Sequence, residues 1–368
     1  MPSKLCCIFN TPSLYRELIY TKIDKAYDCD WFFEDADFKL KEFETEKLKH
    51  VKRLKTFKIG PFYGVNKLIS LIRNPQYTHY IMLGHTRNIS GLAFLFLKRF
   101  FYRNKKIFLW THGIYGNENF LERVWKHLLY QWSDGLLIYG DYACSLMQKI
   151  GYDEKKLFPI HNSLNYDKQI VLRNKLQPNG IYNRHFGNNY PTLIFIGRLQ
   201  SGKRLDMLLR AVADLKNSGM NFNVVFVGDG DEHDSLEKLA VSLGISDNVW
   251  FYGACYDEET NGILVYNADL CVAPGNIGLT AMHSLMFGCP AISHNDFSHQ
   301  MPEFEAIKQG RTGAFFEHGS QKSLELTISN WFKHPGYNRN EIRANCFEEI
   351  DKNWNPEYQM RILNSILK

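Results

Sequence analysis

The chain has 368 residues, a formal net charge of +5, and a composition that is 45% hydrophobic and 14% aromatic. This length exceeds one typical core, and the apolar residues are sufficient for two domains. No apolar stretch reaches the roughly 18 residues of a membrane-spanning helix, which excludes such a helix. The eight cysteines form no Cys-x-x-Cys pair, so we expect reduced thiols in a cytosolic protein and no zinc site.

The positive charge is concentrated in the first half of the chain. Residues 1–185 contain 29 Lys and Arg against 17 Asp and Glu, whereas the remainder contains 15 against 22. Such a basic half predicts an anionic partner: a membrane surface, a lipid phosphate or nucleic acid. Eight of its cations fall in residues 39–58.

Residues 92–106 combine an apolar and aromatic stretch with a basic end. The basic end comprises Lys98, Arg99, Arg103, Lys105 and Lys106. This makeup is typical of a helix at a membrane interface, and equally of a core helix with a solvated basic end.

In the first half, short apolar runs alternate with helical segments. The first ten residues resemble a strand and not a signal peptide, because they lack a long apolar region and a cleavage site. We predict strands at residues 4–9, 30–33, 79–83, 107–111, 135–139 and 157–160. This alternation favours a parallel sheet with crossover helices. His112 follows one of these strands, where a histidine serves acid–base chemistry, hydroxyl binding or a structural role.

A second domain of the same kind is predicted after residues 174–191, which are rich in Asn, Gly, Pro and Gln. Its strands are expected at residues 191–196, 223–227, 249–252, 270–273 and 291–293. One stripe of a helix that ends near Gly219 is formed by Leu205, Leu208, Leu209, Val212 and Leu215. Two doubly wound domains bind ligands at the carboxyl ends of their sheets.

Two cations follow the first strand of this second domain, in the segment Gly197-Arg198-Leu199-Gln200-Ser201-Gly202-Lys203. A helix start normally prefers acidic residues, so cations there indicate a bound anion. Paired cations would stabilise a diphosphate leaving group as its charge develops. Taken alone, the segment also fits a solvated basic loop. Gly228 follows the next strand and is compatible with close approach of a ligand.

Residues 274–290 predict a loop, a short helix and a stop after the strand at 270–273. Gly275 and Gly278 allow backbone N–H groups to approach a ligand, and Leu279 and Thr280 begin the helix. The first N–H groups of a helix have no partner within it and lie at its positive end, which suits a phosphate. An ordinary glycine-capped junction would have the same sequence.

Six elements in order match a known family. They are NSLNYD (162–167), GRLQSGKRLDMLL, VVFVGDG, NVWFYGACYDEE, ADLCVAPG, and GLTAMHSLMFGCPAI with PEFEAIKQGRTGAFF. From about Asp134 to its last residue, the chain resembles glycosyltransferase family 4, the group 1 glycosyltransferases. The resemblance implies an α/β GT-B architecture, with two Rossmann-like doubly wound domains facing a central cleft. It implies an acceptor-side domain at 1–180, a nucleotide-sugar domain at 181–345, and a helix at 346–368 that packs back on the first domain.

Site residues are carried over by position from this resemblance. For catalysis it implies His112, which would face donor sugar and acceptor, and the diphosphate-gripping pair Arg198 and Lys203. For donor binding it implies Gly197, Gly228, Tyr252, Gly253, Gly275, Asn276, Gly278, Leu279, Thr280 and His283, with Tyr252 and Gly253 at the base pocket. No cofactor is implied beyond the nucleotide-diphosphate sugar, and no metal is required.

The chain departs from the family at three places. The two glutamates that members usually carry around the phosphate helix are replaced by Gly275 and His283. The glycine-rich loop usual after the first strand is replaced by residues 9–13. Because the departing phosphate itself can take the acceptor's proton in a retaining mechanism, we expect a retuned donor pocket with Asn276 at the sugar and His283 at ribose or phosphate. The alternative is that His283 is a bystander.

The resulting function is a retaining glycosyltransferase that moves a sugar from a nucleotide-diphosphate donor to a glycan, lipid-linked, in surface polysaccharide biosynthesis. It would be cytoplasmic and peripheral on the inner face of the cell membrane through residues 92–106, without nucleic acid as a partner. Alternatives are a catalytically degenerate module, a phosphorylase or a nucleotide-sugar epimerase on the same fold. The Asp-x-Asp spacings at 28–30, 35–37 and 229–231 would suit the metal site of the other major glycosyltransferase fold, but they match chance and the paired phosphate loops disfavour that fold.

Overall fold

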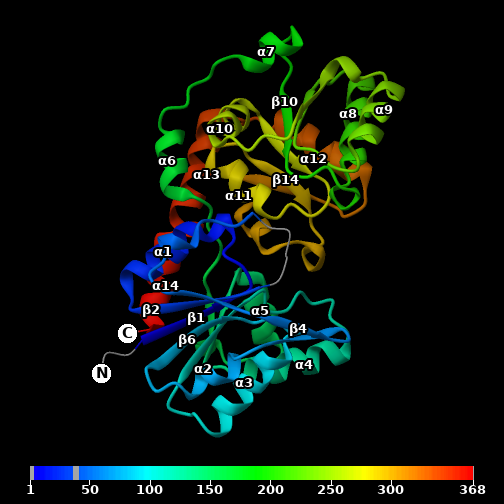
Figure 1. The fold of residues 1–368 in the computed structure, drawn as a ribbon. Coiled ribbons are helices and arrows are strands. Elements are labelled where there is room, and N and C mark those ends of the chain that lie inside the picture. The colour runs from blue at the N-terminus through cyan, green and yellow to red at the C-terminus, as the bar shows by residue number, and fades with distance from the viewer. Residues whose placement is uncertain (1–3, 36–40, 368) are drawn as a thin grey trace. The chain divides into compact units, whose positions relative to one another are not determined.

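The computed structural model describes residues 4–35 and 41–367. The chain forms two compact units: unit 1 comprises Met1–Asn165 and Asn355–Lys368, and unit 2 comprises Tyr166–Trp354. Each unit is an α/β layer structure on a parallel sheet (Figure 1), as predicted. No helix among the described residues combines the length and the apolar character needed to cross a bilayer. Asp37, from the Asp-x-Asp spacing at 35–37, and Lys39, from the basic segment 39–58, lie outside the described residues.

Unit 1 contains a seven-stranded parallel sheet in the order β3-β2-β1-β6-β7-β8-β9. Its strands are β1 (Lys4–Phe9), β2 (Cys29–Glu34), β3 (Val51–Leu54), β6 (Tyr77–Leu83), β7 (Lys106–Thr111), β8 (Gly135–Ile138) and β9 (Leu157–Pro159). All six predicted strands are present. The pattern does not predict β3 or the antiparallel hairpin of β4 (Thr56–Ile59) and β5 (Phe62–Val65), because these short strands carry exposed cations such as Lys52, Arg53 and Lys58.

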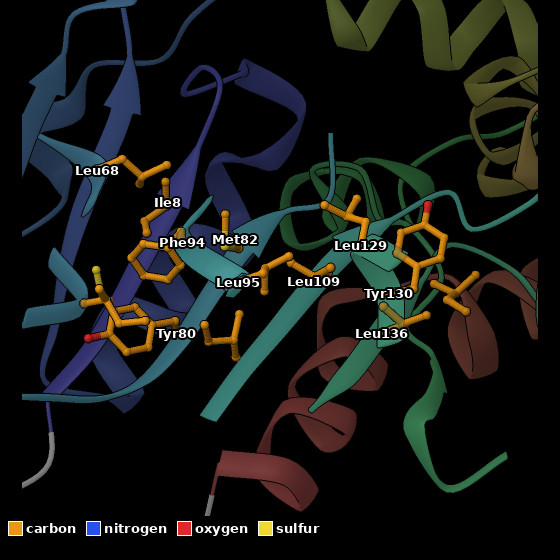
Figure 2. Close-up of a cluster of buried hydrophobic side chains, with 14 of the residues drawn as sticks. Ile8, Leu68, Tyr80, Met82, Phe94, Leu95, Leu109, Leu129, Tyr130 and Leu136 are labelled. Atoms are coloured by element: carbon orange, nitrogen blue, oxygen red, sulfur yellow. The ribbon is translucent and has the colours of Figure 1, made fainter. Parts of the chain in front are cut away.

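Helices cover both faces of this sheet, and the side chains of β1 show why. Cys6 and Ile8 point to one face, where they pack with residues of α2 (Leu68–Arg73), α3 (Ile89–Phe100), α4 (Phe120–Gln131) and α5 (Asp141–Lys149). Leu5, Cys7 and Phe9 point to the other, with α1 (Glu17–Ala26) and α14 (Pro356–Leu367). Figure 2 shows Ile8 and Met82 of the sheet with Phe94 of α3. A parallel sheet buried on both faces accounts for the continuous apolar runs in the sequence.

Unit 2 contains a six-stranded parallel sheet in the order β12-β11-β10-β13-β14-β15. Its strands are β10 (Thr192–Ile196), β11 (Asn223–Val227), β12 (Val249–Gly253), β13 (Leu270–Ala273), β14 (Ala291–His294) and β15 (Gly313–Phe316), of which β15 is an addition to those predicted. Its helices are α6 (Tyr166–Arg173), α7 (Ile181–Phe186), α8 (Leu205–Asn217), α9 (His233–Ser242), α10 (Glu258–Asn267), α11 (Leu279–Met286), α12 (Gln321–Lys333) and α13 (Arg339–Asn353). The predicted leucine stripe is the buried face of α8. Short 3-10 turns complete the chain: η1 (Leu14–Arg16), η2 (Thr45–Lys47), η3 (Glu154–Lys156), η4 (Ser201–Lys203), η5 (Ser246–Asn248), η6 (Phe297–His299) and η7 (Pro302–Ala306).

The chain passes from unit 1 to unit 2 after residue 165 and returns to unit 1 after residue 354, whereas we expected these boundaries after residues 180 and 345. The helix α6 belongs to unit 2 because it packs on α10 and α11, and Arg173 forms a bidentate ion pair with Asp351 of α13 (3.0 and 2.9 Å). The final helix α14 packs on α1 and buries Leu363 in the core of unit 1. Both boundaries between the units are therefore determined by helix packing and not by the composition of the connecting segment.

Both sheets have a point at which the strand order reverses, between β1 and β6 in unit 1 and between β10 and β13 in unit 2. In open α/β sheets, ligands bind outside the carboxyl ends of the strands at such a point. The loops that follow β10 and β13 carry the predicted phosphate site. The loops that follow β1 and β6 include η1 and residues 84–88.

Candidate functional site

Glycines bring the loops after β10 and β11 into backbone contact. Gly228 has φ of +149°, and a Cβ built on it would lie 1.8 Å from the carbonyl oxygen of Gly197. Gly230 has φ of +159°, and its Cβ would lie 2.3 Å from the oxygen of Leu199. A side chain at either position would push the loops apart. Gly228 therefore holds the Gly197–Lys203 loop in place.

Lys203 is anchored against the loop that precedes α11. Its Nζ donates a hydrogen bond to the carbonyl oxygen of Asn276 (2.5 Å), and the N–H of Gly275 donates to the carbonyl oxygen of Lys203 (2.9 Å). Burial lowers the pKa of Lys203, an effect that the nearby negative charge of Glu303 opposes. Arg198 is exposed, and no described residue forms an ion pair with it. The structure thus joins Lys203 to the second predicted loop and leaves Arg198 available to a ligand.

The N-terminus of α11 lies next to the end of β10. The hydroxyl of Thr280 donates to the carbonyl oxygen of Ile196 (2.9 Å), and the N-cap Gly278, with φ of +51°, supplies no side-chain cap. The first N–H groups of this helix, near Leu279 and Thr280, have no acceptor within the helix. A cation and an uncapped helix start at one strand-order reversal are the features that suit a phosphate oxyanion.

The structure leaves no room for a side chain at Gly275, the position at which the resemblance implies a glutamate in the family. A Cβ at this position would lie 2.1 Å from the oxygen of Gly202 and 2.9 Å from the backbone of Lys203. The loop that carries Lys203 therefore occupies the space of a side chain at 275.

His283 is tied to an acidic residue that the sequence pattern does not single out. Its Nε2 lies 3.0 Å from Oε1 of Glu258 on α10, and Nε2 of Gln169 donates to the same oxygen (2.5 Å). Burial raises the pKa of Glu258, but the hydrogen bonds from His283 and Gln169 outweigh it, so the pKa is lowered. Glu258 stands in the motif NVWFYGACYDEE, yet only the fold brings it to His283.

A cavity of about 440 Å³ opens at the ends of β11 and β12, where we predicted the base pocket. Gly253 lines it together with Asp229, Gly230, Asp231, His233 and Asp234. Tyr252 is not among the lining residues, because its ring packs edge-on against Trp250 with centroids 5.1 Å apart. Within residues 4–35 and 41–367, no group of three or more His, Cys, Asp and Glu could hold a metal.

In unit 1, His112 lines a cavity of about 360 Å³ at the carboxyl ends of β1, β6 and β7. Burial lowers its pKa to about 4, with further contributions from Arg16 and Lys126. The imidazole is therefore neutral near pH 7, so it can exchange hydrogen bonds with a hydroxyl without carrying charge. Its ring packs on Tyr139, with centroids 4.6 Å apart.

Comparisons with known proteins relate most of unit 2 to a family of sugar-transferring enzymes. Residues 183–349 match the family of group 1 glycosyl transferases. The GDP-mannose-dependent alpha-(1-6)-phosphatidylinositol dimannoside mannosyltransferase of Mycobacterium tuberculosis is 34% identical over 103 residues, which are 27% of this chain and 26% of that protein. An uncharacterized 41.2 kDa protein in the cps region of Klebsiella pneumoniae is 26% identical over 251 residues, 62% of this chain and 64% of that protein. The chain thus matches less than two thirds of the length of either relative.

Solved structures resemble the whole chain. Anabaena Alr3699/HepE in complex with UDP has a TM-score of 0.74, and the apo lipopolysaccharide outer core galactosyltransferase WaaB has a TM-score of 0.72. Each is 16% identical, and each comparison covers 99% of both chains. This likeness confirms the two-domain GT-B fold. The match of residues 183–349 to the group 1 glycosyl transferases, together with relatives named as glycosyltransferases, supports a transferase activity.

Proposed function

We propose that the protein is a retaining, family 4 glycosyltransferase that moves a sugar from a nucleotide-diphosphate donor to a lipid-linked glycan in surface polysaccharide biosynthesis. One observation carries the donor half of this proposal: the loops after β10 and β13 are joined by the two hydrogen bonds between Lys203 and residues 275–276. They hold a cation beside an uncapped helix start, where a diphosphate would develop charge as it leaves.

The chemistry does not depend on a protein carboxylate at 275. In a retaining reaction on one face of the sugar, the departing phosphate accepts the proton of the acceptor hydroxyl. Lys203 and Arg198 then stabilise the diphosphate, and Asn276 offers a neutral amide to the sugar. His283, held by Glu258, would contact ribose or phosphate through its remaining ring nitrogen.

The names of similar proteins agree with this substrate class. HepE is described in complex with UDP and with UDP-glucose, WaaB is named as a galactosyltransferase of the lipopolysaccharide outer core, and the Klebsiella relative is encoded in a cps region. These names support a nucleotide-sugar donor and a surface glycan as acceptor.

A glycan- or nucleotide-binding module without turnover is the second candidate, favoured by Gly275 and His283 at the positions of the two family glutamates. The test is release of nucleoside diphosphate from a panel of nucleotide sugars, with and without a lipid-linked glycan extract. We expect slow release without acceptor, and faster release with formation of a glycoside when acceptor is added. Donor binding without any release would establish the binding module, and release of nucleotide without a glycoside product would favour the epimerase.

The structure changes which cations of residues 92–106 are available to contact a membrane. Lys98 is buried and forms an ion pair with Asp134 (2.6 Å), and Lys105 is buried and donates to the carbonyl oxygen of Asn74 (2.6 Å). Lys106 also lies 3.5 Å from Asp134. Three of the five cations in 92–106 are therefore engaged within unit 1. The exposed residues of the segment are Phe96, Arg99, Phe100, Phe101, Arg103, Asn104 and Lys106, and among its exposed cations only Arg99 and Arg103 form no ion pair within the described residues.

We accordingly propose that Arg99 and Arg103, flanked by these phenylalanines, attach unit 1 to an anionic membrane. Changing both arginines to glutamine is expected to lower binding to phosphatidylserine vesicles by roughly tenfold or more, since each surface cation contributes about 1 kcal/mol. The measurement is vesicle co-sedimentation at low and high salt. Arg123→Gln, at an exposed position on α4, is the matched control. Unchanged, salt-insensitive binding of the double variant would contradict the proposal.

A further inference from the structure

A buried arginine lies in the ligand-binding region of unit 1. Arg16 ends η1, which follows β1 at the point where the strand order reverses, and it lines the same cavity as His112. Residues 9–13, which we expect to replace the family's glycine-rich loop, lie just before η1, and Asn10 and Ser13 line the same cavity. The cavity therefore contains a cation close to the position at which a loop of backbone N–H groups would be expected.

The charge of Arg16 has no anionic partner in the described part of the chain. Its Nε donates to the hydroxyl of Tyr15 (3.0 Å), one terminal nitrogen donates to the hydroxyl of Tyr20 (3.1 Å), and the other donates to the hydroxyl of Tyr139. No ion pair joins it to an Asp or Glu among residues 4–35 and 41–367, although its residue is only 7% exposed. Buried charges in proteins are normally paired, because removing an ion from water is costly.

Aromatic rings surround the same guanidinium. Its central carbon lies 5.4 to 5.8 Å from the ring centroids of Phe9, Tyr15, Trp110 and Tyr139. These rings compensate part of the positive charge, but they do not use its N–H groups. A guanidinium has five N–H groups, and three are used by the tyrosines, so two remain for a ligand.

Two neighbouring side chains of the cavity also have unused polar atoms. Trp110 is 1% exposed, and its indole Nε1 has no hydrogen-bond partner among the described residues. The same holds for Nδ1 of His112. An indole nitrogen is only a donor, so the unsatisfied group requires an acceptor, and buried donors are rarely left without one.

Lys126, the other cation of this cavity, is not available in the same way. Its Nζ donates to Oε1 of Glu118 (2.7 Å) and to the carbonyl oxygen of Gly113 (3.0 Å). Its charge is therefore paired within unit 1. The uncompensated charge and the free N–H groups belong to Arg16 and Trp110.

We propose that Arg16, together with the indole N–H of Trp110, binds an oxyanion of the acceptor, a phosphate group in the first instance. A guanidinium with two free N–H groups matches two phosphate oxygens, and the neutral His112 alongside would contact an adjacent hydroxyl. The proposal depends on the proposed function only in assigning this phosphate to the acceptor. The acceptor class is then a glycan or lipid that carries a phosphate near the hydroxyl that receives the sugar.

The test uses the indole N–H signals of the full chain in a nitrogen–proton correlation spectrum, titrated with inorganic phosphate. The signal of Trp110 is assigned by its loss in Trp110→Phe. We expect this signal to shift and saturate with phosphate, and Arg16→Gln to weaken the affinity by roughly tenfold or more, as loss of charge-assisted hydrogen bonds implies. Because the signal reports on unit 1 and requires no turnover, its failure is distinct from failure of sugar transfer.

The controls separate a ligand site from a structural arginine. Arg53→Gln removes an exposed arginine of unit 1 that pairs with Glu42 (2.6 Å), and it should leave the phosphate shift unchanged. Arg16→Lys retains the charge without the planar fork, and should still show the shift at lower affinity even if Arg16→Gln does not fold.

Three results would overturn the proposal. The first is a Trp110 indole signal that does not shift when phosphate is added. The second is a phosphate-induced shift of that signal that is the same in Arg16→Gln and Arg16→Lys as in the wild type. The third is a Trp110 shift produced by UDP at the concentration that saturates unit 2. The last result would assign the anion site to the donor diphosphate.

Discussion

Replacing Lys203 by methionine is expected to lower kcat/KM for nucleotide-sugar turnover by roughly two to three orders of magnitude, the usual effect of removing one group that stabilises developing charge. Methionine retains the length and apolar part of the side chain but removes the charge beside the start of α11. It also removes the hydrogen bond to the carbonyl oxygen of Asn276. Because the charge forms as the diphosphate leaves, the loss should fall mainly on kcat.

The measurement is nucleoside diphosphate release at several donor concentrations. Lys216→Met makes the same chemical change at an exposed position at the other end of α8 and should leave turnover unaltered. A Lys203→Met variant that retains wild-type kcat and KM would show that the cation at this loop has no role in the reaction. Thermal unfolding of both variants separates a loss of folding from a loss of turnover.

Placing a glutamate at position 275, where the resemblance to the family implies one, is expected to abolish donor binding and not to improve catalysis. In this chain any side chain at 275 would meet the backbone of Gly202 and Lys203 at 2.1 to 2.9 Å. The Lys203 loop would have to move, which would break its two hydrogen bonds to residues 275–276. Gly275→Ala tests the steric argument alone, and we expect it to destabilise unit 2 by about 1–3 kcal/mol, as overpacking does.

Gly202→Ala is the matched control, because a Cβ at 202 meets nothing within 4 Å. Both alanine variants and Gly275→Glu would be compared by urea unfolding and by titration with nucleoside diphosphate. We expect Gly202→Ala to match the wild type in both measurements. Faster turnover in Gly275→Glu would mean that the loop adapts and that the missing carboxylate limits catalysis.

Much of the fold and part of the site could be predicted because they depend on local patterns. Continuous apolar runs with turn residues at their ends mark parallel strands, and the phosphate elements recur at those ends in a set order. The sequence pattern does not predict the hairpin β4–β5, because its short strands mix apolar residues with exposed cations and lack a clear hydrophobic periodicity. The segment 92–106 was ambiguous for the same reason: hydropathy does not distinguish a cation in water from one paired beneath the surface, as Lys98 is with Asp134.

Contacts between residues distant in the chain could not be predicted. Glu258 and His283 meet because α10 and α11 both pack on α6. Arg16 meets Tyr139 because η1 and Tyr139 follow β1 and β8 at the same edge of one parallel sheet. The chain order of residues determines which strands and glycine loops form, since these follow from short-range sterics and burial. Packing between those elements decides which charges are paired and which are buried without a partner. It also decides why position 275 excludes a glutamate. Only the folded chain brings the atoms concerned within contact distance.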